Sequence, residues 1–188
     1  MITALISLMA AENLLLNEPK TPSLPEPNII VAAYPERTGK SIKPIIEAKS
    51  VLSLDLETGK VLFENGPDQE LPMASLTKLM TALVILDNHD LNEIVTIDKR
   101  ATQVEPAKIY LKAGEQFTIR DLFKGLFIKS ANDVALALAY HDSQDLDTFV
   151  EKMNKKAQEI GLKNTQFKNP TGLDLEGQYS TANDLAIL

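Results

Sequence analysis

The chain has 188 residues, of which 44% are apolar and 24% are charged. This length and composition are typical of one globular domain and exclude a disordered chain. The net charge of −7 argues against nucleic acid as a partner, because phosphate binding needs clustered Lys and Arg and the two signs are interspersed here. The sequence has no cysteine, and its two histidines, His89 and His141, are too few for most zinc sites. We therefore expect no metal site and no cofactor.

The N-terminal part differs from the rest in composition. The apolar run over residues 2–16 is too short to span a bilayer, so we do not expect a transmembrane helix. Residues 1–17 are interpreted either as the remnant of a secretory signal, although the usual positively charged segment is missing, or as a weakly helical leader that carries no targeting signal. Six of the ten prolines precede residue 50. This density predicts an extended linker over 18–47 and a folded domain over 48–188.

From residue 50 onward the hydrophobic pattern is that of folded segments. Two β-rich runs at 50–55 and 60–63 flank a turn and predict a β-hairpin. A shorter strand is predicted at 94–97, and turns are predicted at 112–115, before Thr118, and at 169–172. Apolar residues then recur at helical spacing. Helices are expected over 75–87, over 119–128 after a cap at Thr118, beyond Ser130, over 146–160 before a cap at Gly161, and after a capping box at Ser180 and Thr181.

The order of these elements predicts the fold class. Strands are followed by a run of helices, and the helix beyond Ser130 is small and apolar nearly all round at 134–139, which indicates burial among other helices. The helix after Thr181 stops at Leu188 before it is complete. We expect an α/β sandwich that is incomplete at its C-terminal end.

Ser75 and Lys78 are the first candidates for catalysis. They lie one helical turn apart at the start of a predicted helix, so both side chains share one face. A serine hydroxyl becomes a nucleophile when a base and the positive end of a helix dipole lie close to it. Apolar neighbours would lower the pKa of Lys78 and allow it to accept that proton. The alternative is a surface helix start with a solvated lysine.

Ser130 and Asn132 form a second group at the boundary between two predicted helices. The hydroxyl of Ser130 can pass a proton to a leaving amine. The amide of Asn132 can bind the substrate backbone and hold Lys78 in place. The alternative is structural, with Ser130 as the cap of the following helix and Asn132 as the partner of a backbone group.

These motifs resemble those of the serine D-alanyl-D-alanine carboxypeptidases, which are low-molecular-mass penicillin-binding proteins. Ser-x-x-Lys, Ser-x-Asn and a Lys-Thr-Gly element are shared by the β-lactamases and the penicillin-binding proteins, and the first two are present here in that order. The longer stretches are similar to the carboxypeptidase branch, so the resemblance covers about residues 48–188. These stretches are Leu71-Pro-Met-Ala-Ser-Leu-Thr-Lys-Leu-Met-Thr-Ala82, Ser130-Ala-Asn-Asp-Val-Ala135, Phe167-Lys-Asn-Pro-Thr-Gly-Leu-Asp174 and Tyr179-Ser-Thr-Ala182.

The resemblance implies a fold of the β-lactamase and penicillin-binding-protein type, with an antiparallel sheet and a helical subdomain. It implies that Ser75 attacks the carbonyl between the two terminal D-alanines of a peptidoglycan stem peptide, with Lys78 as base, Ser130 as proton relay and Asn132 as a substrate-binding residue. The backbone N–H of Ser75 would be one oxyanion donor. Penicillins and other β-lactams would acylate the same Ser75.

The sequence departs from the family in one respect, because it contains no Lys-Thr-Gly. In the family this element follows the Tyr-Ser-Thr-Ala stretch on a central strand, so we expect it beyond Leu188. That strand would pair with the N-terminal hairpin. We expect the 188-residue chain to be inactive or nearly so.

Competing interpretations remain open at this point. A β-lactamase shares Ser75 and Lys78, and a D,D-endopeptidase that cuts cross-links shares the whole constellation. A non-catalytic peptidoglycan-binding module would keep the fold without turnover. Because the expected substrate lies outside the cytoplasmic membrane, the resemblance also implies a periplasmic or cell-envelope location, reached through a signal peptide. Membrane association is expected only through segments outside this sequence.

Overall fold

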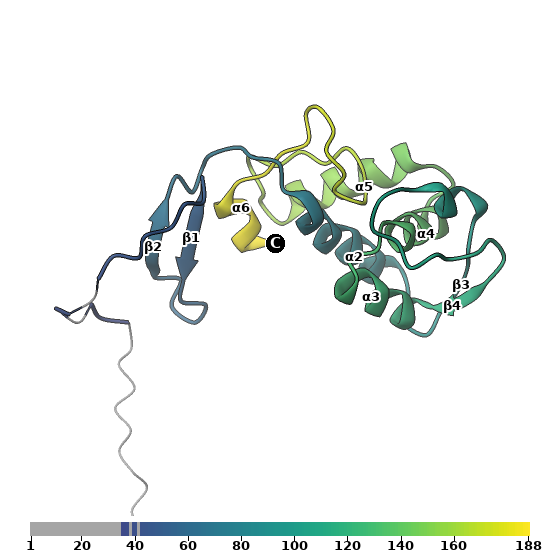
Figure 1. Cartoon of the computed structure of the whole chain (residues 1–188), viewed down its shortest axis with the longest axis horizontal. Helices are drawn as coiled ribbons and strands as arrows, with labels where there is room; N and C mark the ends of the chain where they lie inside the picture. The colour runs from purple at the N-terminus through teal and green to yellow at the C-terminus, as the bar shows by residue number, and fades with distance from the viewer. Residues whose placement is uncertain (1–34, 38, 41) are drawn as a thin grey trace, which may run out of the picture. The chain divides into compact units, whose positions relative to one another are not determined.

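The computed structural model describes residues 35–37, 39–40 and 42–188 (Figure 1). A compact unit extends from Arg37 to Leu188. The predicted leader at 1–17 lies outside the described residues, as does linker segment 18–34. The predicted start of the domain near residue 48 stays a prediction. Among the described residues, no helix has both the length and the apolar character needed to cross a membrane.

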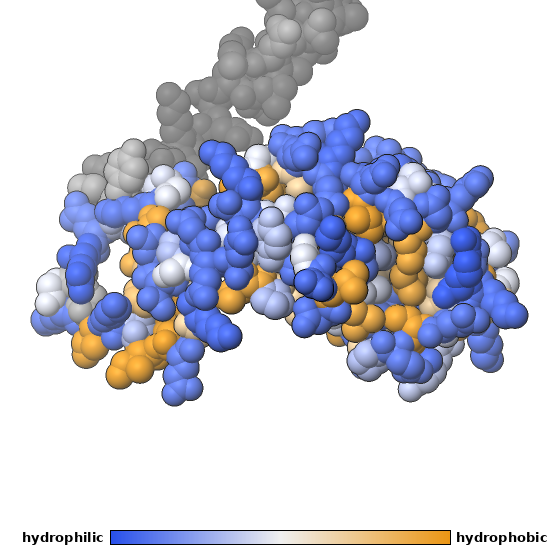
Figure 2. All heavy atoms as spheres, turned by 90° about the horizontal axis from the view of Figure 1, so that it is seen from above, coloured by the Kyte–Doolittle hydropathy of each residue, from blue (hydrophilic) through white to orange (hydrophobic). Residues whose placement is uncertain are grey.

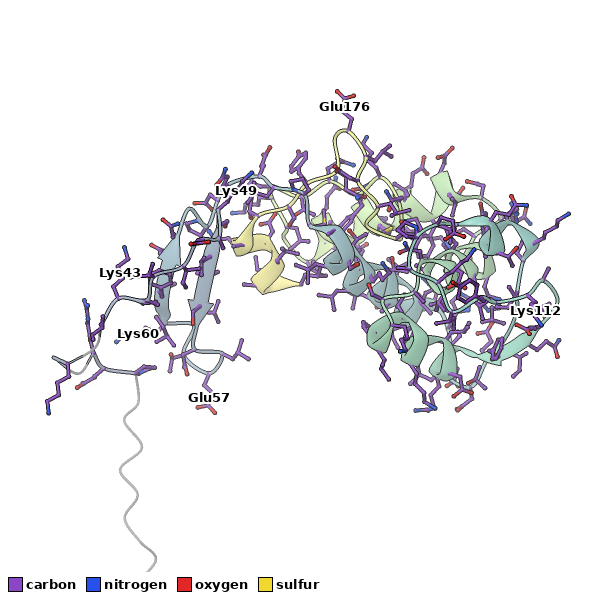
Figure 3. The ribbon with its side chains drawn as sticks, in the orientation of Figure 1. Lys43, Lys49, Glu57, Lys60, Lys112 and Glu176 are labelled. Carbon is purple, nitrogen blue, oxygen red and sulfur yellow. The ribbon has the colours of Figure 1, made fainter. Side chains whose placement is uncertain are left out.

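The predicted hairpin is present. Strands β1 (Val51–Leu54) and β2 (Val61–Asn65) pair antiparallel, with Val51 opposite Asn65 and a register shift after Ser53. The Asp55 carboxylate accepts from the backbone N–H of Thr58 at 2.9 Å and closes the turn. In Figure 3, Glu57 extends outward from this turn. The hairpin is only partly covered, since β1 lies beside helix α6 (Ala182–Ile187) and most of β2 is exposed.

Helix α2 (Thr77–Asn88) is the centre of the helical part. It contacts α3 (Ile119–Ile128), α4 (Asn132–Asp142) and α5 (Leu146–Glu159), which surround it in Figure 1. The predicted helices are thus all confirmed, with end differences of a few residues. The expected caps are also present. The hydroxyls of Thr118 and Thr181 accept from Asp121 N and Asp184 N, each at 3.1 Å, and Gly161 adopts a φ of +86°.

The predicted burial of α4 is confirmed. The side chains of Val134, Ala135, Leu138 and Ala139 have no exposed surface. Alanine has a small side chain, so neighbouring helices approach α4 closely, and α2, α3 and α5 all contact it. Apolar side chains also reach the surface, and Figure 2 shows orange groups between the mostly hydrophilic residues of the face in view.

A second two-stranded sheet contacts helices α3 and α4. Strand β3 (Ile94–Thr96), which was predicted, pairs antiparallel with β4 (Gln116–Thr118), which was not. The sequence indicated only a turn before Thr118, and that turn exists through the bond from Glu115 N to Lys112 O at 3.1 Å. A strand of three residues is too short to show an alternating pattern. A 3₁₀ helix at Lys99–Gln103 was also not predicted.

Candidate active site

Ser75 and Lys78 meet at the N-terminal end of α2. Ser75 belongs to a single 3₁₀ turn (Ala74–Leu76) that leads into the helix, so the predicted helix begins in a tighter form than expected. Lys78 Nζ lies 3.4 Å from Ser75 Oγ. The Lys78 side chain is buried, with 3% of the residue exposed, and burial lowers its pKa to about 8. A fraction of the Lys78 amine is therefore neutral near neutral pH and can accept a proton from the neighbouring hydroxyl.

Ser130 approaches Ser75 from the connection between α3 and α4. Its backbone has a φ of +53°, in the left-handed region that costs a non-glycine residue energy. In this conformation its hydroxyl donates to Ser75 Oγ at 2.8 Å. The alternative role as a helix cap is wrong, because the N-cap of α4 is Ala131 and no side chain caps that helix. The strained backbone instead brings a second hydroxyl to Ser75.

Asn132 is the first residue of α4 and is buried. Its amide nitrogen donates to Pro106 O at 2.7 Å, and its backbone N–H donates to Ala107 O at 2.7 Å. It therefore fixes the preceding loop to the helix, as the structural alternative expected. The contact that we expected it to make with Lys78 is taken by a different residue.

That residue is Thr171, whose carbonyl oxygen accepts from Lys78 Nζ at 2.5 Å. The next turn of α2 holds the same loop, because Thr81 Oγ1 donates to Pro170 O at 2.7 Å. The sequence predicted a turn at residues 169–172, within a stretch that resembles the family, but gave these residues no role at the site. Nothing in their spacing indicates that a backbone carbonyl would reach the lysine.

The turn that carries Thr171 is rigid for local reasons. The side-chain oxygen of Asn169 accepts from the backbone N–H groups of Thr171 at 3.0 Å and of Gly172 at 2.7 Å. Gly172 has a φ of +81° and touches the backbone of Ala74, so that a Cβ placed on it would lie 1.9 Å from Ala74 O. Ala74 is itself in the left-handed region, with a φ of +47°. The position of the residue before Ser75 is thus fixed by a glycine far along the chain.

An open pocket of about 470 Å³ lies over these groups. Its lining is mostly apolar, and its polar side chains are those of Ser75, Lys78 and Ser130. The lining residues are Met73, Ala74, Ser75, Leu76, Lys78, Leu79, Leu126, Phe127 and Ser130. A hydroxyl with a base on one side and a second hydroxyl on the other, in a partly desolvated pocket, has the arrangement needed for covalent acyl transfer.

A family model described as D-alanyl-D-alanine carboxypeptidase matches residues 37–188. The chain belongs to this family. The carboxypeptidase of Bacillus subtilis (strain 168) named DacF is 43% identical over an alignment of 163 residues, and the match covers 84% of this chain. A protein of Pseudomonas aeruginosa named D-alanyl-D-alanine endopeptidase is 36% identical over an alignment of 168 residues, and the match covers 88% of this chain.

The fold of this chain also has solved counterparts. Penicillin-binding protein 5 of Haemophilus influenzae superposes with a TM-score of 0.72 at 38% identity, covering 78% of this chain and 45% of that one. The predicted fold class, antiparallel strands with a helical subdomain of the penicillin-binding-protein type, is confirmed. The chain spans 42% of the Bacillus subtilis relative and 54% of the Pseudomonas aeruginosa relative.

Proposed function

We propose that this chain carries the nucleophile of a serine-type D-alanyl-D-alanine carboxypeptidase, which trims the terminal D-alanine from peptidoglycan stem peptides. The observation that supports this most directly is the double contact of Ser75 Oγ, with Lys78 Nζ at 3.4 Å and with Ser130 Oγ at 2.8 Å. The family to which the chain belongs agrees with this chemistry.

The proposed reaction begins with the neutral fraction of Lys78. Its amine takes the proton of Ser75 as Oγ attacks the carbonyl between the two D-alanines. The tetrahedral intermediate collapses, the C–N bond breaks, and Ser130 gives its proton to the departing amine of the terminal D-alanine while it regains one from the protonated Lys78, which becomes neutral again. The ester on Ser75 is then hydrolysed by water, which releases the shortened peptide. A β-lactam would acylate Ser75 in the same way, its ring amide taking the place of the peptide bond.

Two further groups have positioning roles in this proposal. The carbonyl of Thr171 holds Lys78 Nζ close to Ser75. Asn132 stays our candidate for binding the substrate backbone, through its amide oxygen, because its amide nitrogen already donates to Pro106 O.

We propose an extracytoplasmic location, in the periplasm or cell envelope, because the stem peptide is found there.

Endopeptidase activity is the second candidate, because one relative at 36% identity has that name. The same serine, base and relay would cut a D-alanyl cross-link. A β-lactamase would differ in hydrolysing the penicilloyl ester on Ser75 rapidly, and a non-catalytic binding module would form no ester at all.

The test is intact mass spectrometry after incubation with benzylpenicillin. It uses this chain, a longer version that includes a Lys-Thr-Gly strand, and a Ser75→Ala form of each. We expect the longer version to gain one penicilloyl adduct that depends on Ser75 and persists for minutes or longer, and the 188-residue chain to gain little. An adduct that disappears within seconds indicates a β-lactamase. No adduct on either wild-type form would refute the assignment of the nucleophile.

A comparison of two substrates separates the remaining candidates. The longer version is incubated with a pentapeptide ending in D-alanyl-D-alanine and with a cross-linked peptide dimer, and products are separated by chromatography. Release of free D-alanine supports the carboxypeptidase. Faster conversion of the dimer to monomers supports the endopeptidase.

A further inference from the structure

A second cluster of reactive side chains lies at the ends of α2 and α4 opposite to Ser75 and Asn132. His89 is the C-terminal cap of α2, and His141 lies in the last turn of α4. Glu93 lies in the connection between α2 and β3, directly before that strand. Sequence spacing gave no sign of this cluster, because the two histidines are far apart in the chain and meet only when the two helices pack together.

The carboxylate of Glu93 lies between the two imidazoles. Its Oε2 is 3.0 Å from His89 Nδ1, and its Oε1 is 2.8 Å from His141 Nε2. The three donor atoms lie within 4.8 Å of one another. The side chains are partly exposed, 16% for His89, 39% for Glu93 and 19% for His141, so an ion in solution can reach them.

The other ring nitrogen of His89 has a partner of its own. Its Nε2 lies 3.2 Å from Asp142 Oδ1, and the Asp142 side chain is only 1% exposed. Lys152 Nζ and Ser143 Oγ each donate to the second oxygen of Asp142 at 2.7 Å. A buried carboxylate on the outer nitrogen of a histidine is the arrangement that orients metal-binding imidazoles, because it fixes the N–H outward and leaves the inner nitrogen as a ligand.

We propose that His89, Glu93 and His141 bind one divalent transition-metal ion, with Zn²⁺ as the preferred ion. The ligand atoms are His89 Nδ1, one carboxylate oxygen of Glu93, and His141 Nε2. Two imidazoles and one carboxylate are a common zinc ligand set with a fourth position for water. Ligands at about 2.0–2.1 Å in a tetrahedral site lie roughly 3.3 Å apart. The contacts of Glu93 with His89 and His141, at 3.0 and 2.8 Å, are already close to this spacing, whereas the widest separation in the cluster, up to 4.8 Å, must shorten when the ion binds. Hard ions such as Mg²⁺ and Ca²⁺ prefer all-oxygen sites and fit poorly here.

Two features distinguish this cluster from an ordinary hydrogen-bonded network. His89 has a carboxylate oxygen next to each ring nitrogen, Glu93 Oε2 at 3.0 Å from Nδ1 and Asp142 Oδ1 at 3.2 Å from Nε2. Asp142 therefore holds the outer nitrogen while Nδ1 faces the shared carboxylate of Glu93. The C-terminal ends of α2 and α4 also meet here, and the carbonyl ends of helices favour a cation.

The ion would have a structural role and would not take part in acylation. The twelve residues of α2 separate its two ends by about 18 Å at a rise of about 1.5 Å per residue. The bound ion would tie the ends of α2 and α4 to the start of β3. It would thereby raise the thermal stability of the helical part. This proposal does not depend on the proposed peptidase activity.

The experiment uses the full chain, purified without a histidine tag and treated with a chelator. Because the whole sequence has these two histidines and no cysteine, any imidazole-dependent binding reports on this cluster. Calorimetric titration with Zn²⁺ is expected to show one site, and Co²⁺ is expected to give the visible absorption of a tetrahedral complex. Glu93→Gln and His141→Gln should each weaken Zn²⁺ binding at least about tenfold. Glu151→Gln, which removes an exposed carboxylate on α5, should leave it unchanged.

A measurement on the unaltered chain keeps the proposal testable even when a variant unfolds. The ring nitrogens of both histidines are followed by NMR during the Zn²⁺ titration, with Mg²⁺ as the control ion. We expect His89 Nδ1 and His141 Nε2 to shift together, saturating at one equivalent, and no change with Mg²⁺. The proposal is overturned when neither ring responds to Zn²⁺, or when the two ligand variants bind Zn²⁺ as tightly as the native chain.

Discussion

The Nζ atom of Lys78 donates to the carbonyl oxygen of Thr171 at 2.5 Å, although 93 positions separate the two residues in the sequence. The lysine is therefore held by a backbone group from the C-terminal part of the chain. The same turn contacts Ala74 through Gly172. The geometry around Ser75 thus depends on two segments that are remote in sequence, and substitutions in either segment should disturb it.

Gly172→Ala tests this dependence. The new methyl group would lie 1.9 Å from Ala74 O, and the residue would keep a φ of +81°, so both sterics and backbone strain oppose the native turn. We expect the free energy of unfolding to fall by about 3 kcal/mol or more. Urea unfolding measures this change.

Gly161→Ala is the matched control for Gly172→Ala. Gly161 also has a positive φ, +86°, but a Cβ there meets no atom within 4 Å. It should lose only the conformational cost, about 1–2 kcal/mol. An equal decrease in the free energy of unfolding in the two variants would show that the close contact between Gly172 and Ala74 does not affect stability.

The pKa of Lys78 predicts a pH dependence of stability. Burial lowers this pKa from 10.5 to about 8, so between these values the unfolded chain binds more protons than the folded chain. The free energy of unfolding contributed by Lys78 therefore rises with pH in this window and is constant below it. Relative to a Lys78→Met variant, the native chain should gain at most about 3 kcal/mol between pH 8 and pH 10.5.

Parallel urea titrations of the native chain and the Lys78→Met variant measure this gain, because the other titrating groups cancel in the difference. A difference that stays flat from pH 7 to pH 10.5 would mean that Lys78 has an ordinary pKa in the folded chain. The same pKa predicts that acylation of the longer, Lys-Thr-Gly-containing version becomes faster as the pH rises toward 8, since more of the lysine is neutral.

Ser130→Ala separates a proton relay from a structural residue. The substitution removes the 2.8 Å hydrogen bond to Ser75 and leaves the backbone in place. We expect the acylation rate of the longer version by benzylpenicillin to fall by about 10²–10⁴, the usual contribution of a proton-transfer group. Rapid-quench mass spectrometry measures this rate.

Ser130→Gly is the control for backbone effects, because glycine relieves the strain at a φ of +53°. It should be at least as stable as Ser130→Ala and equally slow in acylation. Native-like acylation by either variant would remove Ser130 from the mechanism.

Asp133 anchors the loop that Asn132 contacts. It is buried, and its carboxylate accepts from the backbone N–H groups of Ile109 at 3.1 Å and Leu111 at 3.0 Å. Asp133→Asn keeps the shape but removes the charge and turns one acceptor into a donor. We expect a loss of about 2–4 kcal/mol in the free energy of unfolding and faster hydrogen exchange at both amides.

The exposed Asp121 at the start of α3 provides the comparison for Asp133, and Asp121→Asn should cost less than about 1 kcal/mol. Unchanged exchange at the Ile109 and Leu111 amides in Asp133→Asn would show that the loop is held by other contacts. Hydrogen exchange followed by NMR gives both amides in one experiment.

The sequence allowed the helices and part of the site to be predicted because these depend on local information. The apolar spacing of α2 places Lys78 one turn after Ser75, and helical geometry alone brings the two side chains close together. Capping residues such as Thr118 and Thr181 have their hydrogen-bond partners three residues away. Features of this kind are encoded within a few residues of the chain.

Features formed by long-range contacts could not be predicted. The role of the Thr171 carbonyl depends on how the turn at 169–172 returns to α2, and a backbone group leaves no residue-type signature. The meeting of His89 with His141 requires the packing of two helices. Strand β4 has only three residues, so its pairing with β3 was decided by the neighbouring strand and not by its own pattern.

The contact between Lys78 and Thr171 also bears on when the site forms during folding. Helix α2, which follows the 3₁₀ turn of Ser75, can form from local contacts, whereas the turn at 169–172 must first close a long loop onto it. Before that closure the amine is hydrated and protonated at neutral pH, and Ser75 lacks a base. In the longer, Lys-Thr-Gly-containing version, reactivity of Ser75 toward a β-lactam would therefore report the completion of tertiary structure, and chains with helices alone would stay unlabelled.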